Sequence, residues 1–142
     1  MFPLDTKFLV VDDSSTMRKI VRNTLGELGY KNIVEADDGA TALPLLQQAQ
    51  QSSSPFQVIF SDSNMPKMKG LELLAACKND PQLKIIPFFM ATVESERHQI
   101  TQAMKGGASE YIIKPFDATV LKDKMSKVFA QLEKSRTAKA SS

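Results

Sequence analysis

Three acids, a hydroxyl and an ammonium each come directly after an apolar run of this chain. Asp12 and Asp13 follow the first run, and Asp62, Thr92 and Lys114 follow later ones. If these runs are strands of one parallel sheet, the five groups meet at its carboxyl edge, where open α/β sheets bind ligands. Three carboxylates in one crevice repel each other, and a divalent cation such as Mg²⁺ would neutralise them. The hydroxyl and the ammonium suit an anion, so the set predicts phosphoryl transfer.

The elements that must position these groups are predicted as repeated strand–helix units. Apolar runs alternate with stretches of helical period, which is typical of a parallel sheet covered by helices. The predicted strands are residues 7–11, 32–36, 56–61, 85–91 and 109–113. Helices are expected over residues 15–28, 39–50, 71–78, 95–105 and 118–132, with Ser14 or Ser15, Asp38 and Asp117 as N-caps. Gly29 should end the first helix as a left-handed cap, and Pro44 should kink the second.

Residues 1–133 are expected to form one domain. The polar segment 47–55 is expected to be a mobile loop, and residues 134–142 lack apolar periodicity and are expected to be a frayed or disordered tail.

Bulk composition narrows the class of protein. The formal net charge of the 142-residue chain is +2, which argues against nucleic-acid binding, because that needs clustered Lys and Arg. A single cysteine, Cys77, excludes an internal disulfide and fits a reducing compartment. No apolar stretch approaches the ~20 residues that span a bilayer, and the first residues lack the features of a signal peptide. We therefore expect a cytoplasmic protein without a membrane segment.

The order and spacing of several short motifs resemble the receiver domains of two-component response regulators, most closely the single-domain chemotaxis members. The resemblance covers about residues 7–132 and rests on FLVVDD (8–13), STMR (15–18), SDSNMP (61–66), GLELL (70–74), Thr92, GAS (107–109) and KPF (114–116). It implies a flavodoxin-like α/β fold, a five-stranded parallel sheet of order 2-1-3-4-5 with helices on both faces.

The resemblance also implies roles for individual residues. Asp62 would be the phosphoacceptor, taking a phosphoryl group from a phosphohistidine of a histidine kinase. Asp13, Asp62 and the backbone carbonyl of Asn64 would hold Mg²⁺, with Asp12 acting through a water. Lys114 would pair with a phosphoryl oxygen, and the peptide between Lys114 and Pro115 would be cis.

A switch is implied by the same family. Thr92 would hydrogen-bond a second phosphoryl oxygen, and this pull would be coupled to an inward turn of Tyr111, which changes partner affinity. Asn64 and Glu94 would flank the path of the water that removes the phosphoryl group. Ser63 departs from the pattern, since chemotaxis relatives often carry a bulky aromatic there, and it should open the rim of the site.

The expected function is a monomeric signalling protein, not an enzyme, that assists its own phosphorylation and dephosphorylation. Its expected partners are a histidine kinase and a flagellar motor switch protein, with a phosphatase as a further candidate. Three alternatives stay open: a phosphorelay or kinase-regulating receiver, a small Mg²⁺-dependent phosphohydrolase, and an unphosphorylated scaffold. His98 is expected to be a plain surface residue and Cys77 a buried small hydrophobe.

Overall fold

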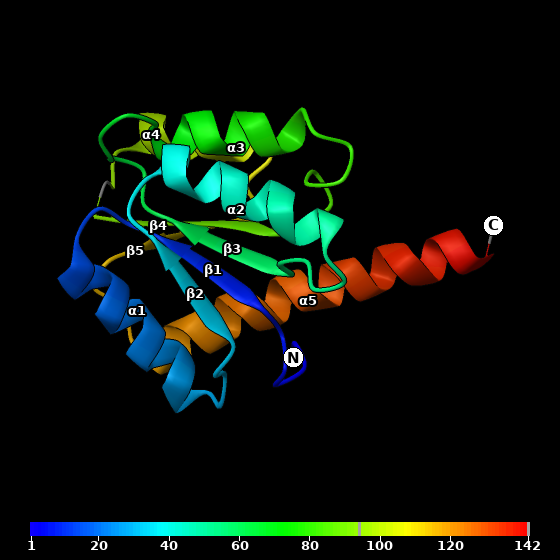
Figure 1. Ribbon diagram of the computed structural model, residues 1–142. Helices are drawn as coiled ribbons and strands as arrows, with labels where there is room; N and C mark the ends of the chain where they lie inside the picture. The colour runs from blue at the N-terminus through cyan, green and yellow to red at the C-terminus, as the bar shows by residue number, and fades with distance from the viewer. Residues whose placement is uncertain (94, 142) are drawn as a thin grey trace.

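The computed structural model describes residues 1–93 and 95–141, with side chains as far as Ser135, as one layer of strands between two layers of helices (Figure 1). The strands are β1 (Phe8–Val11), β2 (Ile33–Ala36), β3 (Val58–Ser61), β4 (Phe88–Thr92) and β5 (Glu110–Ile113). The helices are α1 (Ser15–Glu27), α2 (Gly39–Gln51), α3 (Gly70–Lys78), α4 (Arg97–Lys105) and α5 (Ala118–Ser141). Strand and helix alternate along the chain, as the sequence predicts.

The five strands form one parallel sheet in the order β2-β1-β3-β4-β5. This is the predicted order, and the predicted fold class is confirmed. Helices α1 and α5 cover one face of the sheet, and α2, α3 and α4 cover the other (Figure 1). The order reverses direction between β1 and β3, and at such a point the connections leave on opposite faces and open a crevice at the carboxyl edge.

Each strand contributes to two separate cores, because successive side chains point to opposite faces of a sheet. Leu9 and Val11 pack in the core beneath α2, α3 and α4, whereas Phe8 and Val10 pack in the core beneath α1 and α5. Both faces of β1 are therefore buried, which is why its sequence is a continuous apolar run instead of an alternating one.

The helix caps follow the sequence prediction closely. The side chain of Ser14 accepts a hydrogen bond from the Met17 backbone N–H at the start of α1. Asp38 caps α2 in the same way through Thr41, and Asp117 accepts from the Val120 N–H at 2.9 Å near the start of α5. Gly29 has a φ of 98°, the left-handed conformation predicted after α1.

The start of β4 and the expected 47–55 loop differ clearly from the prediction, whereas the other boundaries before α5 lie within two residues of it. β4 begins at Phe88 and not at Ile85, because Pro87 has no N–H for a ladder and residues 80–86 form consecutive turns instead. α2 continues on both sides of Pro44 as far as Gln51, so the first part of the expected 47–55 loop is helical.

The C-terminal segment continues α5. The backbone of α5 stays helical to Ser141, and the last turns project away from the body of the molecule (Figure 1). Helical hydrogen bonds form within the segment itself, so they need no apolar stripe, and whether this part frays in solution stays a prediction.

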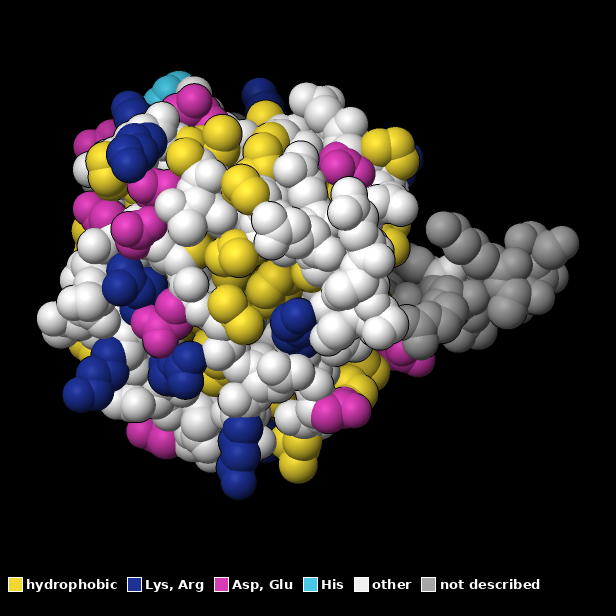
Figure 2. Space-filling model, in the orientation of Figure 1, with side chains coloured by type: hydrophobic (Ala, Val, Ile, Leu, Met, Phe, Trp, Pro, Cys, Tyr) yellow, Lys and Arg dark blue, Asp and Glu magenta, His cyan; other side chains and the backbone are white. Residues whose placement is uncertain are grey.

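The surface carries mixed charge. On the face that Figure 2 shows, basic and acidic side chains lie interspersed around a central group of hydrophobic side chains. Among residues 1–93 and 95–141, no helix combines the length and the apolar content that a membrane crossing requires.

Candidate phosphate and metal site

Backbone hydrogen bonds of the sheet continue one residue past the strand ends and hold the polar groups in register. The Asp12 N–H donates to the Ala36 carbonyl at 3.1 Å, and the Asp62 N–H donates to the Val11 carbonyl at 2.9 Å. The Lys114 N–H donates to the carbonyl of Thr92 at 2.8 Å. These groups are therefore fixed at the carboxyl edge of the sheet, as the sequence predicts.

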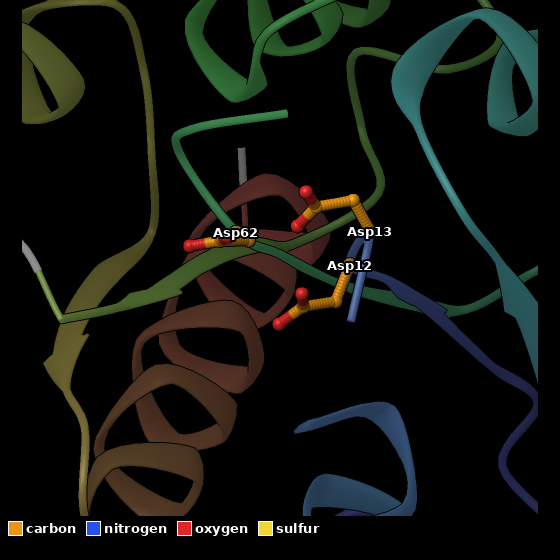
Figure 3. A group of neighbouring side chains, drawn as sticks. All are labelled: Asp12, Asp13 and Asp62. Carbon is orange, nitrogen blue, oxygen red and sulfur yellow. The ribbon is translucent and has the colours of Figure 1, made fainter. Parts of the chain in front are cut away.

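Asp12, Asp13 and Asp62 form a cluster, in which one oxygen of each carboxylate lies within 4.8 Å of the others. The three side chains extend into a common space at the ends of β1 and β3 (Figure 3). Asp12 is buried, Asp62 is half-buried and Asp13 is exposed, so the cluster is open to solvent on one side. Carboxylate oxygens at this spacing are the donors that a hard cation such as Mg²⁺ prefers, so the residues fit that ion.

A buried ion pair lies beside the cluster. The Lys114 ammonium donates to Oδ2 of Asp12, and both side chains are almost fully excluded from water. The other oxygen of Asp12, Oδ1, accepts from the Ser14 N–H at 2.9 Å. Asp12 thus has both oxygens engaged by the protein, whereas Asp13 is exposed. The predicted cis peptide between Lys114 and Pro115 is present.

A second group of charges supports the end of β1 from the side of α1. Arg18 donates to the backbone carbonyl of Asp12 at 2.6 Å and pairs with Glu35 on β2 at 3.1 Å. Arg22 pairs with the other oxygen of Glu35 at 3.0 Å and donates to the Ile33 carbonyl at 2.8 Å. The two guanidinium groups tie α1 to both strands, and sequence reasoning did not find this arrangement.

The surroundings of the Asp62 carboxyl shift its pKa in opposite directions. Burial, as the largest cause, raises its pKa, and the negative charge of Asp12 raises it further. The Thr92 hydroxyl, the Lys114 ammonium and the Ser63 N–H lower the pKa, but the net shift is upward. A cation in the cluster would relieve the same desolvation and repulsion, because an opposite charge favours the ionised carboxylate.

Ser63 makes a contact that the sequence did not reveal. Its Oγ lies 2.8 Å from Oγ1 of Thr92, while its N–H donates to Oδ1 of Asp62 at 2.9 Å. The Ser63 carbonyl accepts from the Gly70 N–H at 3.0 Å. Any Cβ at Gly70 would lie 2.2 Å from the Asp62 carbonyl oxygen, so only glycine lets α3 start this close to the site.

The structure gives the burial of the other residues that the sequence analysis singled out, apart from Glu94. Tyr111 is buried at 6 % exposure on β5, and Asn64 is exposed in the loop after Asp62. Glu94 lies outside the described residues. His98 is exposed and Cys77 is buried, as predicted, and burial raises the pKa of the Cys77 thiol to about 11.

Comparison with known families and structures agrees with this site and fold. The model of the response regulator receiver domain matches residues 8–126. The chemotaxis protein CheY of Pseudomonas aeruginosa is 47 % identical over 126 residues, which cover 89 % of this chain and 98 % of that protein. CheY-3 of Vibrio cholerae is also 47 % identical over 126 residues, covering 89 % of this chain and 93 % of that protein.

Solved structures give the same result. The structure of chemotaxis protein CheY4 of Vibrio cholerae matches with a TM-score of 0.74 and 35 % identity, covering 87 % of this chain and 98 % of that one. The receiver domain of a signal transduction histidine kinase from Syntrophus aciditrophicus matches with a TM-score of 0.74 and 27 % identity, covering 89 % of this chain and 91 % of that one. With the acid cluster, the paired lysine and the buried threonine at the sheet edge, this chain belongs to the response regulator receiver domain family and is of the CheY chemotaxis type.

Proposed function

We propose that this protein is a phosphorylation-controlled switch in chemotaxis. A histidine kinase would supply the phosphoryl group to Asp62, and the phosphorylated form would bind a flagellar motor switch protein. The observation that carries the proposal is the convergence of Asp12, Asp13 and Asp62 with Thr92 and Lys114 at one edge of the sheet. Receiver domains of this type are signalling proteins. Their output is a change in the surface that binds a partner, and not the release of a reaction product.

The reaction follows from the chemistry of the groups present. A carboxylate oxygen of Asp62 attacks the phosphorus of the phosphohistidine, an Asp62 Oδ–P bond forms and the P–N bond breaks. The electron pair of that bond leaves with the imidazole, which takes up a proton. Such transfer depends mainly on positioning and on neutralising charge, so few groups are needed.

The neighbouring residues divide this work. Asp13, Asp62 and the Asn64 carbonyl would hold Mg²⁺, with Asp12 contributing through a water. Bound Mg²⁺ would neutralise negative charge on the acids and the phosphoryl oxygens. The Lys114 ammonium, which forms an ion pair with Asp12 inside the site, would pair with a phosphoryl oxygen. The Thr92 hydroxyl would donate to another phosphoryl oxygen. Tyr111, which is buried on β5, would transmit the effect of phosphorylation to the surface formed by α4, β5 and α5.

Labelling tests the chemistry. Acetyl phosphate or a phosphohistidine donor should label the protein once, on Asp62, and Asp62→Asn should remove the label. Asp37→Asn is the matched control, because Asp37 is an exposed acid that follows β2 at the same sheet edge. Label that persists in Asp62→Asn, or that maps to His98, would contradict the proposal.

The output needs a separate experiment, because the match to a receiver domain of a histidine kinase also fits a relay. Protein treated with beryllofluoride and Mg²⁺, which mimic the phosphorylated carboxyl, should retain a flagellar motor switch protein when the two are mixed. Retention of a kinase or phosphotransfer protein in its place would favour the relay.

A further inference from the structure

The Thr92 hydroxyl is enclosed by protein. Thr92 has 0 % exposure, so water cannot satisfy its single hydrogen or its oxygen, and both must be satisfied by neighbouring groups. One neighbouring group is the Ser63 hydroxyl, whose oxygen lies 2.8 Å from Oγ1 of Thr92. The Asp62 carboxyl lies on the other side of the same serine: its Oδ1 accepts from the Ser63 N–H at 2.9 Å, and the Thr92 hydroxyl lowers its pKa.

Either hydroxyl of the Ser63–Thr92 pair could be the donor, and the nearby Asp62 carboxylate favours one direction. An ionised carboxylate can only accept, and a hydrogen bond to a charged acceptor is stronger than one between two hydroxyls. This preference favours a Thr92 hydrogen directed at Asp62 and a Ser63 hydroxyl that donates to Oγ1 of Thr92. The result is a chain of donors that runs from Ser63 through Thr92 to Asp62. Each bond in such a chain polarises and strengthens the next.

The backbone holds Ser63 in place for this role. Its N–H is bonded to Oδ1 of Asp62, and its carbonyl accepts from Gly70 at the first residue of α3. A Cβ on Gly70 would come within 2.9 Å of the Ser63 Cα, so the start of α3 packs directly against this residue. The Ser63 side chain therefore projects from a fixed point toward Thr92.

From this geometry we infer that Ser63 is a positioning residue, whose hydroxyl orients the Thr92 hydroxyl toward Asp62 before the phosphoryl group arrives. The inference rests on the proposed function of Asp62 and Thr92. When the phosphoryl group is attached, the Thr92 hydrogen passes from a carboxylate oxygen to a phosphoryl oxygen on the same side, while the bond from Ser63 is kept. An aromatic or aliphatic residue at position 63 cannot donate such a bond.

The first test measures the rate of Asp62 phosphorylation by acetyl phosphate at saturating Mg²⁺. Ser63→Ala should slow it about threefold to tenfold, which corresponds to the loss of one hydrogen bond, and Ser63→Thr should restore it, because the hydroxyl is kept. The matched control is Ser15→Ala, since Ser15 is an exposed serine just after the acids of β1. Its rate should equal that of the wild type.

A double-mutant cycle separates positioning from a general structural effect. Thr92→Val keeps the branched shape of Thr92 but removes its hydroxyl, so Ser63→Ala should have no further effect in that background. Equal slowing by Ser63→Ala in both backgrounds would overturn the inference, and so would an unchanged rate in the wild-type background.

A second readout does not depend on phosphorylation at all. In the unphosphorylated protein, three-bond NMR couplings to the Thr92 methyl carbon should show one χ1 rotamer, and Ser63→Ala should give averaged values. Unchanged couplings in Ser63→Ala would overturn the inference about Ser63. Failure of acetyl phosphate to label wild-type protein would instead contradict the proposed function, and the couplings would still decide the role of Ser63.

Discussion

Lys114 and Asp12 are 102 positions apart in the chain, yet they form a buried ion pair across the carboxyl edge of the sheet. Their strands, β5 and β1, are separated by β3 and β4. The pair therefore spans the crevice at the end of the central strands, and it places the ammonium beside the acid cluster. Charges taken out of water this completely depend on each other for stability.

Lys114→Met should destabilise the protein, because it leaves the buried Asp12 carboxylate without its cation. We expect the free energy of unfolding to fall by about 3–5 kcal/mol, measured by urea denaturation without Mg²⁺. Adding Asp12→Asn to Lys114→Met should recover part of this loss, because no unpaired charge remains. Lys105→Met, at an exposed position at the end of α4, is the control. A similar loss in both single variants would show that the ion pair is not the cause.

Mg²⁺ should stabilise the folded protein through the acid cluster, because an ion that binds only the folded state shifts the equilibrium by mass action. At ten times its Kd the gain is about 1.4 kcal/mol, which raises the Tm by several degrees. Asp13→Ala should abolish most of this gain, and Asp37→Asn should keep it. Identical melting curves with and without millimolar Mg²⁺ would rule out a metal site at Asp12, Asp13 and Asp62.

Asn64→Leu should lengthen the lifetime of the phosphorylated form. An acyl phosphate decays when water attacks in line, and the exposed amide of Asn64 leaves room for that water and can orient it. We expect wild-type decay within seconds to minutes and a slowing of at least ~3-fold, below the ~10²-fold typical of a group that transfers the proton itself. Loss of label is followed after removal of the donor. Decay over many hours in wild type would favour a relay over a fast switch.

Cys77 should react slowly with alkylating reagents while the protein is folded. Burial raises the pKa of its thiol from the usual 9.0 to about 11, so the reactive thiolate at pH 8 is about 100-fold scarcer than in the unfolded chain. Between pH 8 and pH 10 the folded rate should keep rising about tenfold per pH unit, whereas the rate in denaturant should level off above pH 9. Mass spectrometry reports this residue alone, since Cys77 is the single cysteine. Equal rates in both states would contradict its burial.

Much of the site could be predicted because it follows from the ends of strands. Asp12 and Asp62 each come after a strand buried on both faces, and such strands are visible in the sequence as apolar runs. Lys114 follows β5, whose first three residues are buried. The caps at Ser14, Asp38 and Asp117 are equally local, because a cap bonds an N–H only two or three residues away.

Contacts between segments distant in sequence could not be predicted in the same way. Ser63 is next to Asp62 in the chain, but nothing local indicates that its hydroxyl meets Thr92, 29 residues further on. Glu35 is likewise an ordinary polar residue of an edge strand until α1 brings Arg18 and Arg22 to it. Each contact depends on how a helix or strand is docked, and docking is set by the whole core.

The sequence by itself determined the alternation of strands and helices, and with it the edge where the acids, the threonine and the lysine lie. Short-range preferences and the burial of both sheet faces suffice for that, because they repeat in every strand–helix unit. Only the tertiary structure decided which of these groups pair. It assigned Lys114 to Asp12 and Ser63 to Thr92, because hydrogen bonds and ion pairs depend on distances of a few ångströms that close packing alone sets.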